Sequence, residues 1–262
     1  MSISVICLTF NHESFVEKAI KGFALQNMSS EIEFLIFDDA SNDLTFDKIS
    51  NSIKFFDLKN TVCLRNEFNL GVNKNFVNAL KTTKYKYIAI CEGDDFWIDS
   101  DKLNKQFRFL ESNPNFSFCC TNISVVNNVD EIIPNAWPNK QKSFVISKRL
   151  LGNALPIPTC SLLFRSNGIV TDDHFLERLA KAPWPDFFLT SWLLTFGKGY
   201  FFEEKTAVYR QHQQGYFTGA PPKIRLKKSR ATRWIFFWFC IKRFRLFSAV
   251  ICFKNIVRFP NF

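Results

Sequence analysis

The segment YIAICEGDDFW, residues 87–97, decides how the rest of the sequence is interpreted. Its first five residues, Tyr87 to Cys91, are apolar and typical of a buried strand. The strand ends abruptly in Glu92-Gly93-Asp94-Asp95, where neighbouring carboxylates repel each other and resist burial. Paired carboxylates at a strand end can bind a divalent cation through oxygen ligands. The alternative is structural, because an aspartate just before the helix expected at Leu103 would be a favourable N-cap.

Strands and helices alternate four times up to the end of this segment. The expected strands cover residues 3–8, 33–37, 61–64 and 87–91, and the helices between them begin after Glu13, cover 45–56 and pass through Phe76. This alternation predicts an α/β fold with a Rossmann-like, mostly parallel sheet and helices on both faces. Weaker patterns further on predict helices at 103–110 and 187–196 and strands at 116–120, 161–164, 200–202 and 207–209.

Polar residues stand at the carboxyl ends of three strands, namely Thr9-Phe10-Asn11, Asp38-Asp39 and Asp94-Asp95. Ligands of open parallel sheets bind in the crevice beyond the carboxyl ends of the strands. We therefore expect both aspartate pairs to face one crevice. The Asp38-Asp39 pair has its own structural alternative, as a cap in the turn between strand and helix.

Charge is distributed unevenly along the 262 residues. The formal net charge is +10, yet no Asp or Glu follows Glu204, whereas 13 of the 34 Lys and Arg residues do. The excess positive charge therefore belongs to the C-terminal part. We expect a catalytic domain over residues 1–222, with a nucleotide-binding half (1–100) and an acceptor half (101–222), followed by a tail over 223–262. The hydrophobic content of 47% excludes a disordered protein.

The tail contains two apolar runs, Trp234–Ile241 and Leu246–Phe253, separated by the basic sequence Lys242-Arg243-Phe244-Arg245. Both runs are shorter than the ~20 residues that span a bilayer. Their mixture of aromatic and cationic residues predicts helices that lie in the interface of an anionic membrane. The alternative is that one run packs against the catalytic domain. Nucleic-acid binding is disfavoured, because the tail contains no recognised nucleic-acid module.

The cysteines and the N-terminus bear on the location of the protein. None of the eight Cys belongs to a CxxC motif or to a Cys/His spacing suited to zinc, and Cys7, Cys91 and Cys160 lie in apolar runs. The chain opens directly with a strand pattern, so no signal peptide is expected. We therefore expect a reducing, cytoplasmic location, with the protein peripheral on the inner face of the plasma membrane.

Two nucleotide-binding motifs are missing, because no GxGxxG follows the first strand and no GxxxxGKS or GxxxxGKT occurs. A nucleotide bound here would need a metal to hold its diphosphate. Four segments nevertheless resemble, in order and spacing, family 2 glycosyltransferases with the GT-A fold, in particular bacterial enzymes of lipopolysaccharide, O-antigen and capsule synthesis. They are ISVICLTFNHESFVEKAIKGFALQ (3–26), FLIFDDASNDLT (34–45), NLGVNKNF (69–76) and YIAICEGDDFW (87–97).

The resemblance implies a nucleoside site near the first two strands. Thr9, Phe10 and Asn11 match the loop that contacts the nucleoside of the donor, and Glu13 lies close to this loop. Phe10 stands where the family usually has Tyr, so it retains a ring that can stack on a base but lacks the phenol. Asp39 matches the carboxylate that accepts a hydrogen bond from the pyrimidine ring.

The resemblance also implies a metal site. Asp94 and Asp95 match the DXD-type motif, with Asp94 facing the ribose or sugar and Asp95 coordinating Mg²⁺ or Mn²⁺ on the diphosphate. The family often has Asp at the position of Glu92, so the role of this first acidic residue stays open. The sequence YRQH resembles a Tyr-Arg-x-His feature of the family, which implies that Arg210 and His212 contact the diphosphate or the metal. A solvated loop histidine is the alternative.

Displacement of a nucleoside diphosphate with inversion needs a base on the opposite face of the sugar. The best candidate is Asp186 in APWPDFFLTSWLLTFGKG (182–199), where aromatic and proline neighbours would desolvate the carboxylate and raise its pKa. The family places its base in a comparable position. The alternative role of Asp186 is the N-cap of the apolar helix that it opens.

These observations predict an inverting, metal-dependent glycosyltransferase. It would move a sugar from a nucleotide donor, with a UDP-linked donor favoured, to a hydroxyl of a lipid-linked saccharide in surface polysaccharide synthesis. One alternative is a metal-dependent nucleotidyltransferase, which also uses paired aspartates. The other is a membrane-bound scaffold that keeps the fold without turnover.

Overall fold

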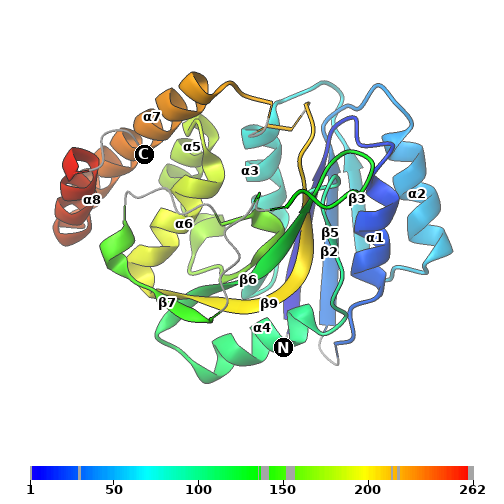
Figure 1. The fold of residues 1–262 in the computed structure, drawn as a ribbon, viewed down its shortest axis with the longest axis horizontal. Coiled ribbons are helices and arrows are strands. Elements are labelled where there is room, and N and C mark those ends of the chain that lie inside the picture. The colour runs from blue at the N-terminus through cyan, green and yellow to red at the C-terminus, as the bar shows by residue number, and fades with distance from the viewer. Residues whose placement is uncertain are drawn as a thin grey trace.

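A nine-stranded sheet runs through the part of the protein that the computed structural model describes, and helices cover both of its faces (Figure 1). The structure describes residues 2–28, 31–134, 136, 142–151, 157–213, 215–216 and 219–258. The strand order is β3-β2-β1-β4-β8-β6-β9-β5, and β7 pairs with β9 outside this path. The mostly parallel α/β sheet predicted from the sequence is confirmed.

The N-terminal half of the sheet is entirely parallel. It consists of β1 (Ser2–Thr9), β2 (Glu31–Asp38), β3 (Thr61–Arg65) and β4 (Tyr87–Ile90). The other half consists of β5 (Phe96–Trp97), β6 (Phe116–Val126), β7 (Phe144–Ile146), β8 (Leu162–Arg165) and β9 (Lys198–Arg210). In this half β6 and β9 are parallel, whereas β8 is antiparallel to both β4 and β6, and β5 and β7 are antiparallel to β9.

Alternate residues of β1, β2 and β4 enter two hydrophobic clusters, one on each face of the sheet. In β1, for example, Val5 and Cys7 belong to one cluster and Ile6 and Leu8 to the other. The first cluster is covered by α1 (Val16–Ala24), α2 (Thr45–Phe55) and α4 (Lys102–Ser112). The second is covered by α3 (Val72–Thr82), α5 (Asp173–Lys181) and α6 (Pro185–Phe196). Burial on both sides explains why these strands read as continuous apolar runs.

Four elements differ from the sequence-based prediction. The strands β5 and β7 and the helix α5 were not predicted, and β9 is one long strand rather than two short ones. The exposed polar residues Glu203, Glu204 and Lys205 suggested a break in β9. The strand continues through them because β6 pairs with it over its length, with register shifts near Asn122 that absorb the irregularity.

Helix α1 packs closely against β5 at Gly22. A Cβ atom at this position would lie 2.9 Å from both the backbone nitrogen and the backbone oxygen of Trp97. We expect Gly22→Ala to lower the free energy of unfolding by about 1–2 kcal/mol, because overpacking against backbone outweighs the gain in helix propensity. Thermal unfolding of this variant, with Lys21→Ala on the exposed face of α1 as a control, tests this. An unchanged melting temperature for Gly22→Ala would contradict the tight packing.

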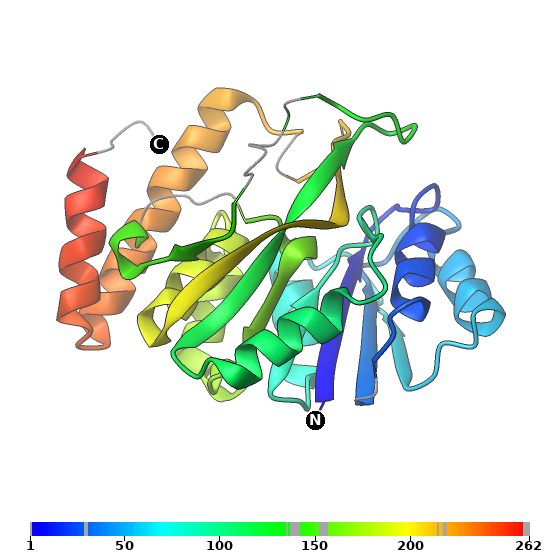
Figure 2. The same ribbon diagram turned by 60° about the horizontal axis from the view of Figure 1, so that its bottom comes forward.

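The tail forms two helices, α7 (Pro222–Lys242) and α8 (Leu246–Arg258), which lie side by side as a hairpin beside α5 and α6 (Figures 1 and 2). The inner face is buried in the second cluster, where the rings of Phe239 and Trp192 lie 4.9 Å apart. The outer face exposes aromatic and aliphatic side chains, including Trp238, Phe244 and Phe247. In the described ranges, no helix combines the length and the apolar character needed to cross a membrane.

Candidate active site

The loops after β1, β2 and β4 meet at one edge of the sheet, as the parallel topology requires. Thr9 is paired with Asp38, and the backbone N–H of Asp39 donates to the carbonyl of Thr9 at 2.9 Å. The N–H of Gly93 donates to the carbonyl of Leu8, also at 2.9 Å. The three polar segments expected at the strand ends are therefore adjacent.

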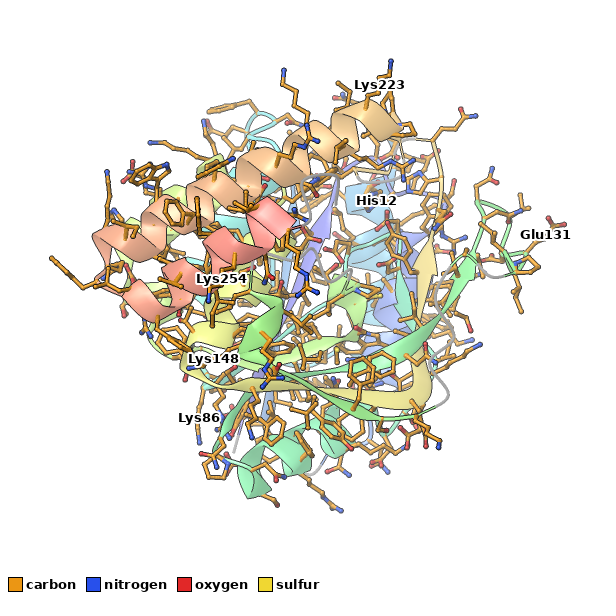
Figure 3. All side chains as sticks on the ribbon, turned by 60° about the vertical axis from the view of Figure 1, so that its left-hand side comes forward. His12, Lys86, Glu131, Lys148, Lys223 and Lys254 are labelled. Atoms are coloured by element: carbon orange, nitrogen blue, oxygen red, sulfur yellow. The ribbon has the colours of Figure 1, made fainter. Side chains whose placement is uncertain are left out.

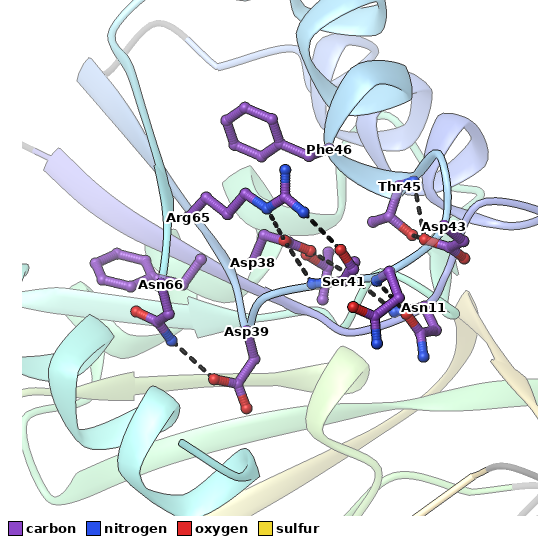
Figure 4. Close-up of polar contacts among 12 residues, drawn as sticks. Asn11, Asp38, Asp39, Ser41, Asp43, Thr45, Phe46, Arg65 and Asn66 are labelled. Carbon is purple, nitrogen blue, oxygen red and sulfur yellow. Dashed lines mark hydrogen bonds and ion pairs between the residues drawn. The ribbon is translucent and has the colours of Figure 1, made fainter. Parts of the chain in front are cut away.

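Asp38 is fully buried and organises the loop between β2 and α2 (Figure 4). Its carboxylate accepts hydrogen bonds from Thr9 Oγ1 at 3.0 Å and from the backbone and hydroxyl of Ser41. The guanidinium of Arg65 lies 3.6 Å from the same carboxylate. These contacts give Asp38 a structural role and occupy the hydroxyl of Thr9.

Asp39 is buried and fixes the start of α3. Its Oδ1 accepts from Asn66 Nδ2 and from the N–H of Leu70, both at 2.8 Å, and its Oδ2 accepts from the N–H of Gly71 at 2.9 Å. Gly71 is the N-cap residue of α3, so the carboxylate satisfies donors at a helix start. The capping alternative thus applies to Asp39, although to the helix after β3 and not to the one after β2.

The loop after β1 is tied to the loop after β2. Asn11, with a positive φ of 54°, accepts at Oδ1 from the N–H of Asn42 at 2.9 Å, and Glu13 accepts from the N–H of Leu44 at 3.0 Å. The side chains of Asn11 and Glu13 are therefore used within the protein. The ring of Phe10, in contrast, is 39% exposed and accessible for stacking.

A cavity of about 380 Å³ lies beyond the ends of β4 and β9, beside the start of α6. Its polar lining residues are Glu92, Asp94, Asp95, Thr159, Asp186, Tyr209, Arg210 and Gln211. The structure thus brings Asp94 and Asp95 together with Asp186, which lies about ninety residues further along the chain. The expectation that both aspartate pairs face one crevice is only half correct, because neither Asp38 nor Asp39 lines this cavity.

Asp94 lies between two imidazoles. His212 Nε2 is 3.0 Å from Asp94 Oδ2, and His12 Nε2 is 3.9 Å from the same oxygen. Burial raises the pKa of Asp94, but His12 and His212 outweigh it and the pKa is lowered below its ordinary value. Burial lowers the pKa of His12, partly offset by Asp94. Asp94 is therefore an anion at the wall of the cavity.

Glu92 is a site residue to which sequence reasoning gave no role. Burial raises its pKa to about 7, while a hydrogen bond from Thr159 Oγ1 to Oε2 at 2.7 Å opposes this shift. The negative charges of Asp94 and Asp186 raise the pKa of Glu92 further, so Glu92 is close enough to both aspartates to interact with them. In the sequence, the only indication that Glu92 belongs to the site is its position next to the aspartates in EGDD.

Asp95 is held in the interior behind Asp94. Its Oδ1 accepts from the backbone N–H of Arg210 at 2.8 Å, which joins the acidic loop to the end of β9. Burial raises the pKa of Asp95 well above its ordinary value, and the nearby charges of Asp94 and Glu92 add to the shift. Asp95 also lines the cavity, and a cation bound beside these crowded carboxylates would lower their pKa values again.

The guanidinium of Arg210 is buried and bonded within the protein. It donates to the carbonyls of Asp94 at 2.9 Å and Asn127 at 2.8 Å and to Asp130 Oδ1 at 2.7 Å. It also lies 4.5 Å from the ring centroid of Phe15. These bonds tie Arg210 to the acidic loop, and Arg210 also lines the cavity. Its contact with a diphosphate stays a prediction.

Asp186 occupies the first turn of α6. The N-cap residue of this helix is Trp184, whose side chain makes no cap hydrogen bond, and Asp186 is the acidic residue of the first turn, where the helix N-terminus also favours a carboxylate. Burial raises the pKa of Asp186, partly offset by the backbone N–H groups of Phe187 and of Asp186 itself. A carboxylate with a raised pKa that lines a cavity is suited to accept a proton.

The site contains side chains that could act as metal ligands. Among the described residues, no group of three or more His, Cys, Asp or Glu side chains has the arrangement of a complete metal site. Asp94 nevertheless offers a carboxylate at the cavity wall, and the imidazole nitrogen of His212 lies 3.0 Å from it. Mg²⁺ is commonly held by one or two carboxylates together with substrate phosphates. The residues present therefore fit a cation that binds jointly with a diphosphate.

The chain is similar to several known proteins. An uncharacterized protein of Mycobacterium tuberculosis is 29% identical over 222 residues, which cover 83% of this chain and 61% of that relative. The chain therefore spans about three fifths of the length of that relative. The Escherichia coli UDP-Glc:α-D-GlcNAc-diphosphoundecaprenol β-1,3-glucosyltransferase WfaP is 32% identical over 110 residues, covering 42% of this chain and 41% of that enzyme.

Solved structures share the fold at low sequence identity. Staphylococcus aureus TarS 1–349 in complex with UDP-GlcNAc superposes with a TM-score of 0.66 at 16% identity, covering 90% of this chain and 66% of TarS. Pyrobaculum calidifontis mannosyltransferase PcManGT in complex with GDP-Man and Mn²⁺ gives a TM-score of 0.66 at 15% identity, with coverages of 92% and 64%. A model of glycosyl transferase family 2 matches residues 4–167, more than half of the sequence. The chain therefore belongs to glycosyl transferase family 2 and has the GT-A fold.

Proposed function

We propose that the protein is an inverting glycosyltransferase that moves a sugar from a nucleotide donor, with a UDP-linked donor favoured, to a hydroxyl of a lipid-linked saccharide. The observation that carries this proposal is the shared cavity, which is lined by Asp94 and, at the start of α6, by Asp186. His212 contacts Asp94 at 3.0 Å. Synthesis of O-antigen, lipopolysaccharide or capsule is the process that uses such acceptors.

The donor is proposed to bind on the side of Asp94. Asp94 and His212 would hold Mg²⁺ or Mn²⁺, which neutralises the diphosphate when bound. The contacts favour Asp94 over Asp95 as the ligand, because Asp95 is buried and accepts from the backbone of Arg210. Phe10, with its exposed ring, remains the candidate for stacking on the nucleoside base, at the loop that also contains Thr9 and Asn11.

The acceptor is proposed to enter on the side of Asp186. A carboxylate oxygen of Asp186 takes the proton of the acceptor hydroxyl while that oxygen attacks the anomeric carbon of the donor sugar. The bond between the anomeric carbon and the diphosphate breaks, and its electron pair leaves with the nucleoside diphosphate. The raised pKa of Asp186 makes its carboxylate a stronger base for this step.

The names of two relatives support the choice of substrates. The Escherichia coli enzymes WfaP and WfgD are named for UDP-Glc as donor and α-D-GlcNAc-diphosphoundecaprenol as acceptor. WfgD is 31% identical over 126 residues, and these matches cover under half of this chain. They favour a UDP-linked donor and a lipid diphosphate acceptor without identifying the sugar.

A panel of nucleotide sugars tests the proposal. The protein is incubated with each donor, Mn²⁺ and a lipid-linked saccharide, and the released nucleotide and the glycosylated lipid are measured. We expect release of a nucleoside diphosphate and growth of the acceptor by one sugar. Pyrophosphate release from a nucleoside triphosphate would instead identify a nucleotidyltransferase, and a protein that turns over none of these substrates would be a scaffold.

We also propose that the hairpin α7–α8 attaches the protein to the cytoplasmic face of an anionic membrane. Phe244 and Phe247 are 88% and 72% exposed, and the neighbouring Lys242 is exposed as well. Exposed aromatic side chains next to cations favour the interface of an anionic bilayer. Figure 3 shows the hairpin at the surface, with Lys223 at the start of α7.

Vesicle flotation tests this attachment. The double substitution Phe244→Glu and Phe247→Glu should weaken binding to vesicles of phosphatidylcholine and phosphatidylglycerol by about a hundredfold or more, because each buried aromatic ring contributes about 1.5–3 kcal/mol. Phe55→Glu is the matched control, because Phe55 is 82% exposed on α2, at the far side of the molecule (Figure 1). Equal flotation of the double variant and the wild type would exclude the hairpin as the attachment site.

A further inference from the structure

Two aromatic rings and a lysine form a cluster at the rim of the cavity, next to Asp186. The rings of Trp184 and Tyr216 both line the cavity and meet edge to face, with centroids 5.4 Å apart. The ammonium of Lys228, from α7, lies 4.7 Å from the centroid of Trp184 and 4.3 Å from that of Tyr216. The cluster thus joins the cavity to the first turns of α7.

The cluster is held by hydrogen bonds from three segments. Trp184 donates through its indole Nε1 to the carbonyl of Arg225 at 3.3 Å, and its backbone N–H donates to Thr232 Oγ1 at 3.1 Å. The hydroxyl of Tyr216 donates to the carbonyl of Pro183 at 3.0 Å. These bonds fix the start of α7 relative to the segment that carries Asp186.

Lys228 carries a charge without an ion-pair partner among the residues that the structure describes. Across the described ranges, no carboxylate lies within ion-pair distance of its ammonium, although the side chain is half-buried. The first turns of α7 carry only basic charges, at Lys223, Arg225, Lys227, Lys228 and Arg230. The cavity is therefore acidic within, at Asp94 and Asp186, and the ammonium of Lys228 lies against the two aromatic rings that line it.

The face from which the acceptor attacks indicates that the acceptor binds beside these two rings. In a single displacement the acceptor attacks from the face opposite to the diphosphate, which places its hydroxyl at Asp186. The remainder of the acceptor then passes the rings of Trp184 and Tyr216. Aromatic rings offer a flat apolar surface to a sugar, and an ammonium pairs with phosphate oxygens as a compact point charge.

We infer that Trp184, Tyr216 and Lys228 form the acceptor subsite, in which the rings pack against the acceptor sugar and Lys228 pairs with the phosphate attached to that sugar. This inference rests on the proposed function and specifies its acceptor as a sugar linked to a phosphate or diphosphate. The helix that provides Lys228 continues directly into the exposed aromatic hairpin, at Trp234 and Trp238. The lipid of such an acceptor would thus stay at the surface where the hairpin is proposed to lie.

Two acceptors that differ only in the phosphate provide the test. One is an alkyl diphosphate-linked sugar, and the other is the neutral alkyl glycoside of the same sugar. We expect Lys228→Met to raise KM for the diphosphate acceptor by about ten- to a hundredfold, as for loss of a hydrogen bond to a charged group. The KM for the neutral glycoside, kcat for both acceptors and the Kd of UDP should stay near wild-type values.

Two further variants separate charge from structure. Lys227→Met removes the same charge from an exposed neighbouring position and should leave both KM values unchanged. Lys228→Arg should restore most of the affinity for the diphosphate acceptor. An equal rise in KM for both acceptors in Lys228→Met would assign the lysine to the support of the rings, and weaker UDP binding would assign it to the donor; either result overturns the inference.

The same assay separates this inference from the proposed function. A wild-type protein that transfers sugar to neither acceptor would contradict the proposed function, and the subsite would fall with it. A wild-type protein that transfers sugar to both, with Lys228→Met leaving every KM unchanged, would contradict the subsite alone.

Discussion

Asp186→Asn should abolish sugar transfer while leaving donor binding intact. Asparagine has nearly the same size as aspartate but cannot take the proton of the acceptor hydroxyl. General base catalysis contributes about 10²–10⁴-fold to rate, so kcat should fall by this factor. The Kd of UDP in the presence of Mn²⁺, measured by calorimetry, should stay near the wild-type value.

The pH dependence of the wild type gives a second readout for Asp186. Burial raises the pKa of this carboxyl, and only its deprotonated form accepts a proton. The kcat should therefore fall as the pH drops through a value above the ~3.9 of an exposed aspartate. The residual activity of Asp186→Asn should lack this acid limb.

Asp173→Asn is the matched control for Asp186→Asn. Asp173 opens α5 with a side chain that is 94% exposed, and its amide variant should retain full activity. Transfer by Asp186→Asn at the wild-type rate would remove Asp186 from the reaction.

Asp94→Asn should remove the effect of Mn²⁺ on donor binding. The substitution keeps the shape of the side chain but removes the charge that lies 3.0 Å from His212 at the cavity wall. Loss of outer-shell partners alone weakens metal binding by about 10–100-fold, so loss of a ligand should weaken Mn²⁺-dependent UDP binding by about a hundredfold or more. Calorimetric titration of UDP with and without Mn²⁺ measures this effect.

Asp95→Asn distinguishes the two possible metal assignments. The family resemblance implies that Asp95 binds the metal, whereas the contacts in the structure favour Asp94. The amide oxygen of Asn at position 95 can still accept from the backbone of Arg210, so Mn²⁺ dependence should survive this substitution. If Asp95→Asn removes the Mn²⁺ effect and Asp94→Asn retains it, the assignment to Asp94 is wrong.

The parallel half of the sheet was predictable because its determinants are local. Each strand of this half is a short run of apolar residues followed by polar loop residues, and the helices between them show helical spacing. The burial of Asp186 in an apolar setting could likewise be predicted from its immediate neighbours, Trp184, Pro185 and Phe187, whereas its role as the base stays a prediction. Features that depend only on residues adjacent in the sequence are the easiest to predict from a single sequence.

The remaining features depend on contacts between distant residues. The bond between Asp95 and Arg210 joins positions 115 apart, and the bonds of Arg210 to Asn127 and Asp130 span 83 and 80 positions. No local pattern in the sequence indicates that these groups bond to one another. The same reason explains why Asp39, which bonds to residues of the loop after β3, was expected in the cavity.

One face of the tail packs against the catalytic domain, as the second alternative predicted, and the other face is exposed; binding of that face to a membrane stays a prediction. Phe236, Phe239 and Cys252 face the body of the protein, whereas Trp238, Phe247 and Val250 are exposed. Aromatic residues are so frequent in α7 that hydrophobicity alone does not separate the two faces. Only the packing against α6 determines which side chains remain available to a membrane.

The anomeric configuration of the product tests the central claim most directly. The claim is that Asp186 activates the acceptor on the face opposite to the departing diphosphate. With an α-linked nucleotide sugar as donor, proton NMR of the purified product should give the coupling constant of a β-linked sugar. A product with the α configuration of the donor would contradict a single displacement with Asp186 as the base.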